Sequence, residues 1–524
     1  MKVLVAEALA QEGLELLREH FQVDEYQGLG PEALLQAIGD YEALIVRSQT
    51  KVNSALIEAG RKLRVIGRAG TGVDNIDLEA ATRRGIVVVN APLGNCISVA
   101  EHTIALLLAL ARNIVRADSS LRAGLWERKK LAGVEVRGKV LGLIGLGRIG
   151  TEVARRAAAL EMAVLAYDPF VPSEHAARSG VRLVSLEELL RQADFISLHV
   201  PATNLTQGMI GANELALVKP TARLINCARG GILDEEALLN ALEGGRLAGA
   251  ALDVFAEEPP RNPRLLSCEK VILTPHLGAS TLEAQRETAL DVVEQVIAVL
   301  KGQPARYAVN LPLVSPEELA TLQPYIDLAG RLGNFYALLA RNNFQALEMS
   351  YSGEVAEYNF SLLTSAAISG LLAPISEEPV NQVNARLISS ERGWKVSESV
   401  SAAKENFASL ITMKVKTSSG ERLVAGTVMR GEPHIVRIDE FWLDFVARGL
   451  LLVSEHIERP GIIGRMGTVL GEAGVSISFI QVGRKEKGGP GVMVLGLDDP
   501  VTPETLERIR ALPSVLDARV VNLG

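Results

Sequence analysis

Residues 140–150 read VLGLIGLGRIG, an apolar run that leads directly into a GxGxxG pattern and then into an amphipathic stretch at 153–160. In a strand–turn–helix unit, Gly145 permits the tight turn, Gly147 lets the backbone approach a pyrophosphate, and Gly150 allows close helix–strand packing. The free N–H groups at the start of the helix favour negative phosphates. This order of elements predicts a dinucleotide-binding turn.

A second predicted strand, 163–167, ends in Asp168, 18 residues after Gly150. A carboxylate at this place can accept hydrogen bonds from both ribose hydroxyls of NAD and would repel the 2′-phosphate of NADP. The alternative interpretation is a glycine-rich turn followed by a surface aspartate, but strand, loop, helix, strand and acid all lie in register. The sequence therefore predicts NAD as the cofactor.

Short apolar strands alternate with helices on both sides of this motif. The expected strands are 3–6, 43–46, 65–67, 87–90, 163–167, 195–198, 223–226, 249–253 and 271–273, and the expected helices include 12–20, 56–59, 98–112 and 282–300. This alternation favours parallel sheets with helical crossovers. We predict an α/β fold with two Rossmann-like, doubly wound parallel-sheet domains: residues 95–281, and residues 1–94 together with 282–310.

Residues 67–74, GRAGTGVD, are also glycine-rich and follow a predicted strand. No amphipathic helix opens at the last glycine, so the stretch lacks the helix N-terminus that phosphates need. We interpret it as a loop that faces the active site instead of a second nucleotide site.

Three segments follow predicted strands at the edge where open α/β sheets place their ligands. They are 226–231 (NCARGG), 253–259 (DVFAEEP) and 274–279 (TPHLGA). Together they offer the guanidinium of Arg229, the carboxylate of Glu258 and the imidazole of His276. Oxidation of a 2-hydroxy acid needs such groups: a histidine base takes the hydroxyl proton, a carboxylate stabilises the imidazolium, and an arginine binds the substrate carboxylate.

Each of these side chains alone has a simpler interpretation. A lone arginine or glutamate is usually a solvated surface residue, and an isolated histidine such as His20, His175 or His434 is more often a surface or core residue. His199 follows a predicted strand, and we expect a structural role for it. The three charged groups at neighbouring strand ends favour catalysis because site residues gather on such loops.

The glycine loop and these three segments resemble the D-isomer-specific 2-hydroxyacid dehydrogenases over roughly residues 1–310. Their order and spacing resemble the phosphoglycerate dehydrogenases within that family. The resemblance implies that His276 is the acid/base, Glu258 its partner and Arg229 the substrate clamp. It also implies that Asp253 approaches the nicotinamide carboxamide, and that residues 1–94 with 282–310 form the substrate-binding domain.

The same resemblance implies further ligand contacts. Cofactor contacts are implied for Thr71, Gly145, Gly147, Arg148, Ile149, Gly150, Asp168, Cys227, Ala228, Arg229, Asp253, His276, Gly278 and Ala279. Substrate contacts are implied for Arg47, Ser48, Arg68, Asn95 and Arg229. A threonine of the family, after the strand-end histidine, is Val200 here, so one minor cofactor contact differs.

Residues 450–524 read as strand, helix, strand, strand, helix and strand, which predicts a separate ferredoxin-like βαββαβ unit without any of the three catalytic candidates. From His456, the sequence HIERPGIIG resembles an ACT domain, a small amino-acid-binding regulatory fold. The α+β stretch before it, 311–449, resembles by placement and length the intervening, allosteric-substrate-binding domain of long phosphoglycerate dehydrogenases.

The ACT resemblance implies feedback control by L-serine through His456, Glu458 and Ser476. Serine-binding relatives often carry Asn or Asp at the position of Glu458 and Asn at that of Ser476, so these two positions depart from the pattern. Residues 97–114 and Trp126 resemble the family's dimer arm, which implies a homodimer or a homotetramer.

The composition argues against several other classes of protein. The formal net charge of −8 comes without a basic block, so a nucleic-acid partner is not expected. The cysteines Cys96, Cys227 and Cys268 match neither a disulfide framework nor a metal site. No signal-like segment opens the chain, and no apolar run reaches the ~20 residues of a membrane span. We expect a cytoplasmic protein without a membrane partner or a bound metal.

The resemblance as a whole implies NAD-dependent oxidation of 3-phospho-D-glycerate to 3-phosphohydroxypyruvate, the first step of phosphorylated L-serine biosynthesis. The alternative enzymes are a hydroxypyruvate or glyoxylate reductase and a D-lactate-type dehydrogenase, which use the same three groups but usually end where the linker begins here. A non-enzymatic NAD-sensing corepressor or scaffold on the same fold is a third alternative. Turnover of 3-phosphoglycerate would separate them.

Overall fold

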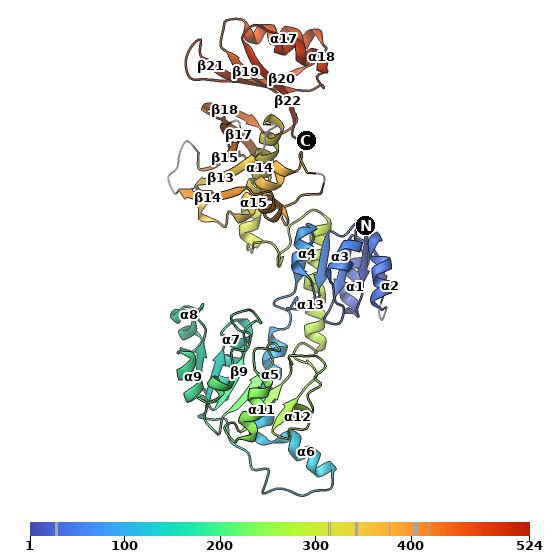
Figure 1. Ribbon diagram of the computed structural model, residues 1–524, viewed down its shortest axis with the longest axis vertical. Coiled ribbons are helices and arrows are strands. Elements are labelled where there is room, and N and C mark those ends of the chain that lie inside the picture. Colours follow the sequence, from blue (N-terminus) through green and yellow to red (C-terminus); the bar gives the residue numbers. More distant parts are fainter. Residues whose placement is uncertain are drawn as a thin grey trace.

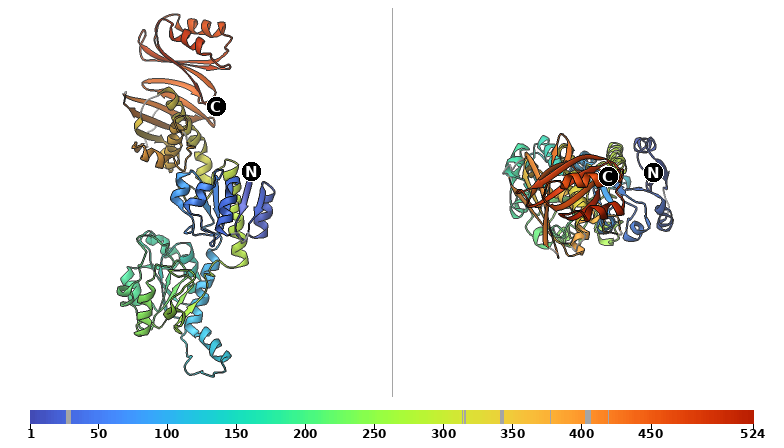
Figure 2. Two further views of the ribbon diagram at one scale, coloured as in Figure 1. Left: turned by 45° about the vertical axis from the view of Figure 1, so that its right-hand side comes forward. Right: turned by 90° about the horizontal axis from the view of Figure 1, so that it is seen from above.

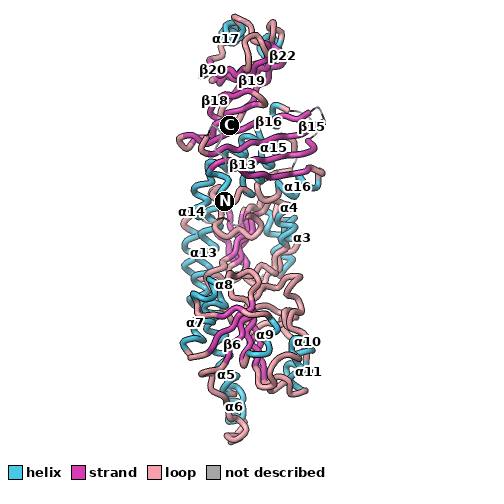
Figure 3. Tube along the Cα trace, turned by 90° about the vertical axis from the view of Figure 1, so that its left-hand side faces the viewer, coloured by secondary structure: helices cyan, strands magenta, loops and turns pink. Residues whose placement is uncertain are grey.

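The computed structural model describes residues 1–26, 30–312, 314, 316–340, 344–376, 378–401, 407–418 and 420–524. Its strands form four sheets that follow one another along an elongated molecule (Figure 1 and Figure 3). The sheets define four units, numbered in chain order, and the first unit lies between the second and the third (Figure 1). Seen along the long axis, the units overlap in a narrow cross-section (Figure 2).

The first unit holds five parallel strands in the order β2-β1-β3-β4-β5. The strands are β1 (Lys2–Val5), β2 (Gln22–Glu25), β3 (Ala43–Val46), β4 (Val65–Arg68) and β5 (Val87–Asn90). The helices are α1 (Gln11–Arg18), α2 (Pro31–Ala37), η1 (Ile38–Asp40), α3 (Ser54–Ala59), α4 (Leu78–Arg83) and α13 (Leu282–Leu300). Apolar cores lie on both faces of the sheet, so all four residues of β3 are buried. Helix α13 packs beside α1, which makes the unit discontinuous in sequence.

The second unit holds seven parallel strands in the order β12-β11-β10-β9-β6-β7-β8. The strands are β6 (Val140–Ile144), β7 (Ala163–Tyr167), β8 (Arg182–Leu183), β9 (Phe195–Leu198), β10 (Arg223–Asn226), β11 (Gly249–Leu252) and β12 (Val271–Leu273). The helices are α5 (Cys96–Arg112), α6 (Ile114–Arg122), α7 (Arg148–Ala159), α8 (Ser173–Arg178), α9 (Leu186–Gln192), α10 (Ala212–Leu215), α11 (Glu235–Glu243) and α12 (Pro263–Leu266). The strand order reverses between β6 and β9, and open parallel sheets bind ligands at such a switch point.

Helix α6 extends away from the second sheet at one end of the molecule (Figure 1). It has no buried residue, and Trp126, which follows it, is 82% exposed. Among the residues that the structure describes, no single helix is long and apolar enough to cross a membrane; α5 and α6, bent by 62° at their junction, meet the length and composition limits only as a pair.

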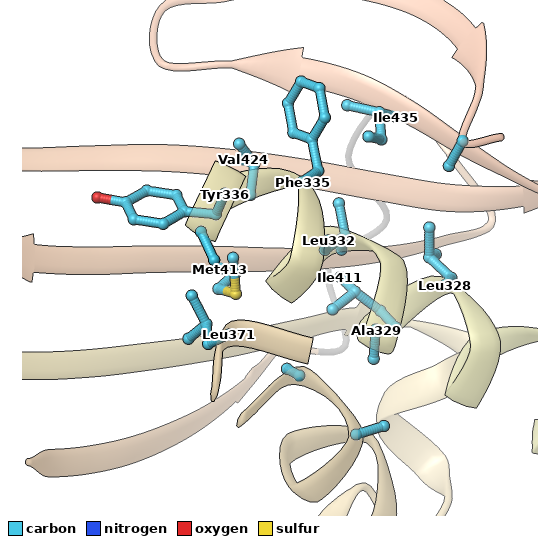
Figure 4. Close-up of a cluster of buried hydrophobic side chains, with 14 of the residues drawn as sticks. Leu328, Ala329, Leu332, Phe335, Tyr336, Leu371, Ile411, Met413, Val424 and Ile435 are labelled. Carbon is cyan, nitrogen blue, oxygen red and sulfur yellow. The ribbon is translucent and has the colours of Figure 1, made fainter. Parts of the chain in front are cut away.

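The third unit holds six strands in the order β14-β13-β15-β16-β17-β18, of which β13 and β14 pair in parallel and the other neighbours are antiparallel. The strands are β13 (Phe344–Gly353), β14 (Lys395–Ser401), β15 (Ser409–Thr417), β16 (Gly420–Met429), β17 (Glu432–Ile438) and β18 (Phe441–Val446). The helices are α14 (Pro316–Leu339), η2 (Glu354–Glu357), α15 (Ser361–Leu372) and α16 (Ala385–Glu391). Phe335 and Tyr336 of α14 join Met413 and Val424 of the strands in one apolar core (Figure 4).

The fourth unit holds four antiparallel strands in the order β20-β21-β19-β22. Its elements are β19 (Leu450–Ile457), α17 (Ile462–Glu472), β20 (Ile477–Arg484), β21 (Pro490–Leu497), α18 (Pro503–Arg510) and β22 (Val515–Asn522). This is the predicted βαββαβ order, with both helices packed on one face of the sheet. The predicted fold class, two parallel-sheet units followed by an α+β unit and a ferredoxin-like unit, is confirmed.

The opposite face of the fourth sheet packs on the third unit. Leu451 and Val453 of β19 and Val494 of β21 belong to the same buried cluster as the α14 side chains. The rings of Phe445 and Phe479 stack across the junction with their centroids 6.3 Å apart. The fourth unit therefore has its own helices, but it shares an apolar core with the third unit and is less separate than its sequence suggests.

Candidate active site

The glycine-rich turn after β6 has the geometry that a dinucleotide loop requires. Gly145 has a φ of 97°, which favours glycine, and a Cβ there would lie 2.5 Å from the His199 carbonyl oxygen. A Cβ at Gly150 would collide with the Gly145 carbonyl oxygen, whereas no heavy atom lies within 4 Å of the Cβ position of Gly147. The backbone of Gly147, which precedes α7, is open to a phosphate, so the turn fits the pyrophosphate of NAD.

Asp168 follows β7 beside this loop. Its Oδ2 accepts the backbone N–H of Leu146 at 2.9 Å, and its Oδ1 accepts the backbone N–H of Phe170 at 2.9 Å. The half-buried carboxylate is thereby fixed against the glycine loop, the position expected of a ribose ligand. Arg148 is exposed and Ile149 is half-buried at the start of α7, next to the phosphate turn.

His199 and Val200 follow β9 on the other side of the loop. The His199 ring hydrogen-bonds Ser197 Oγ at 2.9 Å, and burial lowers the pKa of His199 to about 4, so the ring is neutral. Val200 Cγ1 would lie 2.9 Å from a Cβ at Gly145. Both residues pack against the turn, in agreement with the structural role expected for His199.

The predicted acid/base pair forms after β11 and β12. His276 Nδ1 and Glu258 Oε2 are 2.9 Å apart, and Glu258 Oε1 accepts the backbone N–H of Phe255 at 3.2 Å. Burial would raise the pKa of Glu258, but the hydrogen bond and charge of His276 outweigh burial and lower the pKa. Glu258 is therefore ionised at neutral pH. The His276 side chain is 43% exposed, which leaves its Nε2 free to meet a ligand.

Arg229 follows β10 and connects the first and second units. Its Nη1 donates to the Ala228 carbonyl oxygen at 2.7 Å, and its Nε lies 3.1 Å from Asp74 Oδ2. Asp74 ends the glycine-rich loop of the first unit, and a Cβ at Gly72 in that loop would collide with the Arg229 guanidinium. The loop of residues 67–74 therefore faces the site, as the sequence predicts.

The segment that carries Arg229 packs on the segment that carries Glu258. The Asn226 side-chain amide donates to the Arg229 carbonyl oxygen at 3.0 Å and fixes the turn after β10. A Cβ at Gly230 would collide with the carbonyl oxygen of Phe255, whose own N–H binds Glu258. The turn that carries Arg229 thus packs against the backbone that holds Glu258, and Glu258 in turn pairs with His276.

Arg68 lies close enough to two other arginines, Arg229 and Arg47, for their charges to act on it. The Nε of Arg68, at the end of β4, is buried without a hydrogen-bond partner among the described residues. Burial and then the charge of Arg229 lower the pKa of Arg68 to about 10, and the charge of Arg47 acts in the same direction. The charges of Asp74 and Glu7 act in the opposite direction, so carboxylates also lie in this neighbourhood. Guanidinium groups are well suited to bind a carboxylate or a phosphate. Ser48 is exposed just beyond β3.

Four other predicted residues lie in the glycine-rich loop of the first unit, just before α5, or just before Arg229. Thr71 Oγ1 donates to Asn95 Oδ1 at 2.7 Å, which joins the glycine-rich loop of the first unit to the start of α5. The Ala228 backbone N–H donates to Asn226 Oδ1 at 3.0 Å. Burial raises the pKa of Cys227 to about 12, so its thiol is protonated. Among the described residues all three cysteines are free, and no group of three or more His, Cys, Asp or Glu could hold a metal ion.

Asp253 is 1% exposed at the end of β11. Its Oδ1 accepts the Thr274 hydroxyl at 2.6 Å and the Leu277 backbone N–H at 2.7 Å, and its Oδ2 accepts the Gly278 backbone N–H at 2.8 Å. Asp253 thus holds the loop on both sides of His276. The sequence predicted only that Asp253 approaches the nicotinamide, and did not predict this arrangement.

Helix α5 supplies two contacts to the same loop that the sequence analysis missed. His102 Nε2 lies 3.2 Å from Asp253 Oδ1, and Ser98 Oγ donates to the Gly278 carbonyl oxygen at 2.5 Å. The spacing of four residues is a sequence signal for one helix face, but the segment that this face meets depends on the tertiary structure. Ala279, next in the chain, is half-buried.

The three effector candidates lie in the fourth unit in different environments. His456 is 1% exposed, both ring nitrogens lack a hydrogen-bond partner among the described residues, and burial lowers its pKa. Glu458 lies close enough for its charge to act on His456, and its hydrogen bond with Arg484 lowers the pKa of Glu458. Ser476 is exposed ahead of β20, and its backbone N–H donates to Asp499 at 3.1 Å. The structure brings the first two together and leaves Ser476 on another segment, just before β20.

Three family descriptions match successive parts of the chain. "D-isomer specific 2-hydroxyacid dehydrogenase, NAD binding domain" matches residues 104–278, which contain the glycine loop and the catalytic candidates. "D-3-phosphoglycerate dehydrogenase intervening domain" matches residues 321–439 in the third unit. "ACT domain" matches residues 451–514 in the fourth unit. The order of the matches follows the order of the units.

Relatives of similar length cover the whole chain. It is 45% identical to D-3-phosphoglycerate dehydrogenase of Methanocaldococcus jannaschii over 100% of both chains, and 46% identical to that of Synechocystis over 100% of this chain and 95% of the other. Among solved structures, the TT0316 protein of Thermus thermophilus is 37% identical, has a TM-score of 0.54, and covers 59% of this chain and 100% of its own. A glyoxylate reductase of Paecilomyes thermophila is 33% identical, has a TM-score of 0.54, and covers 61% and 99%. The chain belongs to the D-3-phosphoglycerate dehydrogenases, a family of NAD-dependent oxidoreductases.

Proposed function

We propose that the chain oxidises 3-phospho-D-glycerate to 3-phosphohydroxypyruvate with NAD, the first step of phosphorylated L-serine biosynthesis. The observation that carries this proposal is the His276–Glu258 pair, 2.9 Å apart, at the sheet edge that also holds the glycine loop and Arg229. These groups are a base, a carboxylate that orients it and a cation for the substrate. The name shared by the full-length relatives supports the choice of substrate.

The site residues divide the reaction among them. His276 Nε2 takes the proton of the C2 hydroxyl as the C2–H bond breaks. Glu258 is ionised, accepts the hydrogen bond from Nδ1 and stabilises the imidazolium that forms. Arg229 holds the substrate carboxylate and polarises the C2 oxygen as it becomes a carbonyl oxygen. Bound NAD supplies the acceptor for the hydride from C2; Gly147 and Asp168 would hold its phosphates and ribose.

The ion pair between Arg229 and Asp74 does not prevent substrate binding. The Asp74 side chain is 69% exposed, so water screens this pair, and exposed pairs contribute little stability. A substrate carboxylate with two parallel hydrogen bonds can replace Asp74 as the partner of the guanidinium. This exchange would also release one contact between the first and second units.

We propose that Arg68 and Arg47 bind the phosphate of the substrate, since the buried Nε of Arg68 lacks a partner among the described residues. Arg68→Ala is expected to raise KM for 3-phosphoglycerate about 10- to 100-fold, as for the loss of a charged hydrogen bond of about 1.5–3 kcal/mol. Steady-state kinetics with 3-phosphoglycerate and D-glycerate measure the effect. The increase in KM caused by Arg68→Ala should be smaller with D-glycerate than with 3-phosphoglycerate, because D-glycerate lacks the phosphate. Arg61→Ala, at an exposed arginine of the same unit, is the control and should keep the wild-type KM. An equal KM for 3-phosphoglycerate in the Arg68→Ala and Arg61→Ala variants would contradict the assignment.

Asp168 is proposed to select NAD over NADP. Asp168→Ser should narrow the ratio of kcat/KM for NAD to that for NADP by about tenfold or more, because it removes a like-charge repulsion of about 1–4 kcal/mol. Coenzyme kinetics at saturating substrate check this, with Asp40→Ser at an exposed aspartate as the control. A wild-type enzyme that already prefers NADP would show that the role given to Asp168 is wrong.

A substrate panel tests the proposed function as a whole. The purified protein is assayed with NAD and 3-phosphoglycerate, D-glycerate or D-lactate, and with NADH and hydroxypyruvate or glyoxylate. The proposal expects the highest kcat/KM with 3-phosphoglycerate. A preference for glyoxylate or hydroxypyruvate would favour the reductase alternative, and NADH binding without any turnover would favour the corepressor or scaffold.

We propose that the protein is a homo-oligomer held in part by the extension after α5. The large apolar side chains exposed on this extension are Ile114, Val115, Leu121, Leu125 and Trp126. Contiguous exposed apolar surface is typical of association sites. Trp126→Asp should therefore weaken the dimer or tetramer, as seen by sedimentation velocity over a concentration series. Leu35→Asp, at an exposed leucine of the first unit, is the matched control. A monomeric wild-type protein would refute this proposal.

A further inference from the structure

Helix α5 contacts the loop that carries His276 at two points one helical turn apart. Ser98 Oγ donates to the Gly278 carbonyl oxygen at 2.5 Å. His102 Nε2 lies 3.2 Å from Asp253 Oδ1 and 3.3 Å from Thr274 Oγ1. Positions four apart lie on one face of a helix, so a single face of α5 meets the loop.

Asp253 is the centre of this contact. It is 1% exposed and accepts hydrogen bonds from Thr274, two residues before His276, and from the backbone of Leu277 and Gly278, the two residues after it. Burial would raise the pKa of Asp253, but the hydrogen bonds from His102, Thr274 and the two backbone N–H groups outweigh burial and lower the pKa. The carboxylate is therefore ionised and holds the loop on both sides of the catalytic histidine.

The backbone at His276 needs this support. His276 has a φ of 54°, in the left-handed region that residues other than glycine rarely adopt. Such a conformation persists only where the surrounding contacts determine it. The Asp253 hydrogen bonds on either side of His276 fix the backbone there and therefore the direction of its Cα–Cβ bond. The hydrogen bond to Glu258 fixes only the orientation of the imidazole ring.

The same N-terminal end of α5 also contacts the first unit. Asn95, which precedes the helix, accepts the hydroxyl hydrogen bond of Thr71 at 2.7 Å, and Thr71 belongs to the glycine-rich loop after Arg68. The first two turns of α5, with the residue before them, thus contact both the loop beside the proposed phosphate site and the loop that carries His276. Helix α5 lies beside the second sheet in Figure 1.

We propose that His102 is a positioning residue: through Asp253 and Thr274 it fixes the loop so that His276 Nε2 faces the substrate hydroxyl. This inference rests on the proposed function, because it requires His276 to be the base. It does not place His102 in contact with substrate or cofactor. Its physical basis is that misplacement of a reacting group by about 1 Å can lower the rate about 10²-fold.

The test compares three substitutions of His102 in the full-length chain. His102→Leu removes the donor and should lower kcat by roughly 10- to 100-fold, the cost of a small misplacement. KM for 3-phosphoglycerate and the Kd for NADH should change by less than about threefold, since the proposal gives His102 no contact with either ligand. His102→Gln keeps an amide N–H donor and should retain most of kcat. His102→Asn is too short to reach Asp253 and should lower kcat as the leucine variant does. Because asparagine is polar, this variant provides the same test if the leucine variant folds poorly.

A deuterium isotope effect separates positioning from a merely structural role. With substrate deuterated at C2, the isotope effect on kcat should be larger in His102→Asn than in the wild type, because C–H cleavage becomes more rate-limiting. His434→Leu is the matched control: it removes a His–Asp pair, 2.7 Å to Asp444, from the third sheet. That variant should keep the wild-type kcat and isotope effect.

Two results would overturn the inference. One is a wild-type kcat in both the leucine and asparagine variants of His102. The other is a loss of kcat in the glutamine variant equal to that in the asparagine variant, which would show that the donor is irrelevant. If His276→Ala is inactive in the same assay, the failure concerns His102 alone. If His276→Ala is fully active, His276 is not the base and the inference loses its premise; if the wild type does not turn over 3-phosphoglycerate, the proposed function itself has failed.

Discussion

His276→Ala is expected to lower kcat by about 10²- to 10⁴-fold, the usual contribution of one general acid–base side chain. NADH should still bind, because the glycine turn and Asp168 lie on other segments of the second unit. The substitution also leaves Glu258 without its partner, but that carboxylate is 40% exposed and can be hydrated. Steady-state turnover of 3-phosphoglycerate and fluorescence titration with NADH measure the two properties separately.

The control for this variant is His20→Ala, at an exposed histidine in the first unit. It should keep the wild-type kcat and the same affinity for NADH. Full activity of His276→Ala would remove His276 from the mechanism, and a loss of NADH binding would place its main role in the cofactor site instead.

L-Serine is expected to inhibit the full-length protein, and a chain ending at Pro312 should stay active and lose this inhibition. A ligand bound in the fourth unit can change turnover only if it favours one of two arrangements of the chain. A typical coupling of about 1–3 kcal/mol corresponds to roughly a 5- to 150-fold change. Initial rates over a range of serine concentrations measure the effect in both proteins. His456→Ala in the full chain should weaken inhibition without changing KM.

The structure determines where this chain should be cut. Ending it near Gly449 would expose the apolar surface that the third unit buries against Leu451, Val453 and Val494. A cut after Pro312 keeps Asn310, whose side-chain amide donates to the Ile86 carbonyl oxygen at 2.9 Å. The TT0316 protein, which covers 59% of this chain and all of its own, supports folding of the two parallel-sheet units alone.

Two outcomes would change the account of regulation. Inhibition of the shortened chain by serine would place the effector at the active site. No inhibition of the full-length protein would point first to Glu458 and Ser476, the positions that depart from the pattern of serine-binding relatives. Other amino acids should then be tried on the same proteins.

The parallel strands and the glycine loop could be predicted from sequence because their signals are local. Residues 43–46 and 163–167 are apolar runs, and they form strands with the predicted bounds. The first run is buried throughout and the second is buried at 164–166. Gly145 and Gly150 are fixed by contacts within one strand–turn–helix unit and its neighbouring strand. The edge strand Gln22–Glu25 was missed, since an edge strand that is only half-buried carries few apolar residues.

The catalytic pair could be predicted because carboxyl ends of parallel strands meet at one edge, which brought His276 and Glu258 together. The contacts of His102 and Asp253 could not, since they depend on the face of α5 that the loop meets. The sequence also predicted that the glycine-rich loop faces the site. The ion pair between Asp74 of this loop and Arg229 could not be predicted, because it connects two units and has no local signal.

The sequence does carry a pattern that indicates the shared core of the third and fourth units. Residues 451–453 and 492–495 are continuous apolar runs, and in an antiparallel sheet such runs indicate that both faces are covered. The helices of the fourth unit cover only one face. The second face therefore needed a partner, and the structure shows that the third unit supplies it.

The central claim is that this site oxidises 3-phospho-D-glycerate through His276. The most direct test is the rate of NADH formation from NAD and 3-phosphoglycerate by the wild type and His276→Ala, prepared and assayed side by side. The account predicts steady NADH formation by the wild type and a kcat lower by about 10²- to 10⁴-fold in the variant. No NADH formation by a wild-type protein that binds NADH, or equal rates for the two proteins, would contradict it.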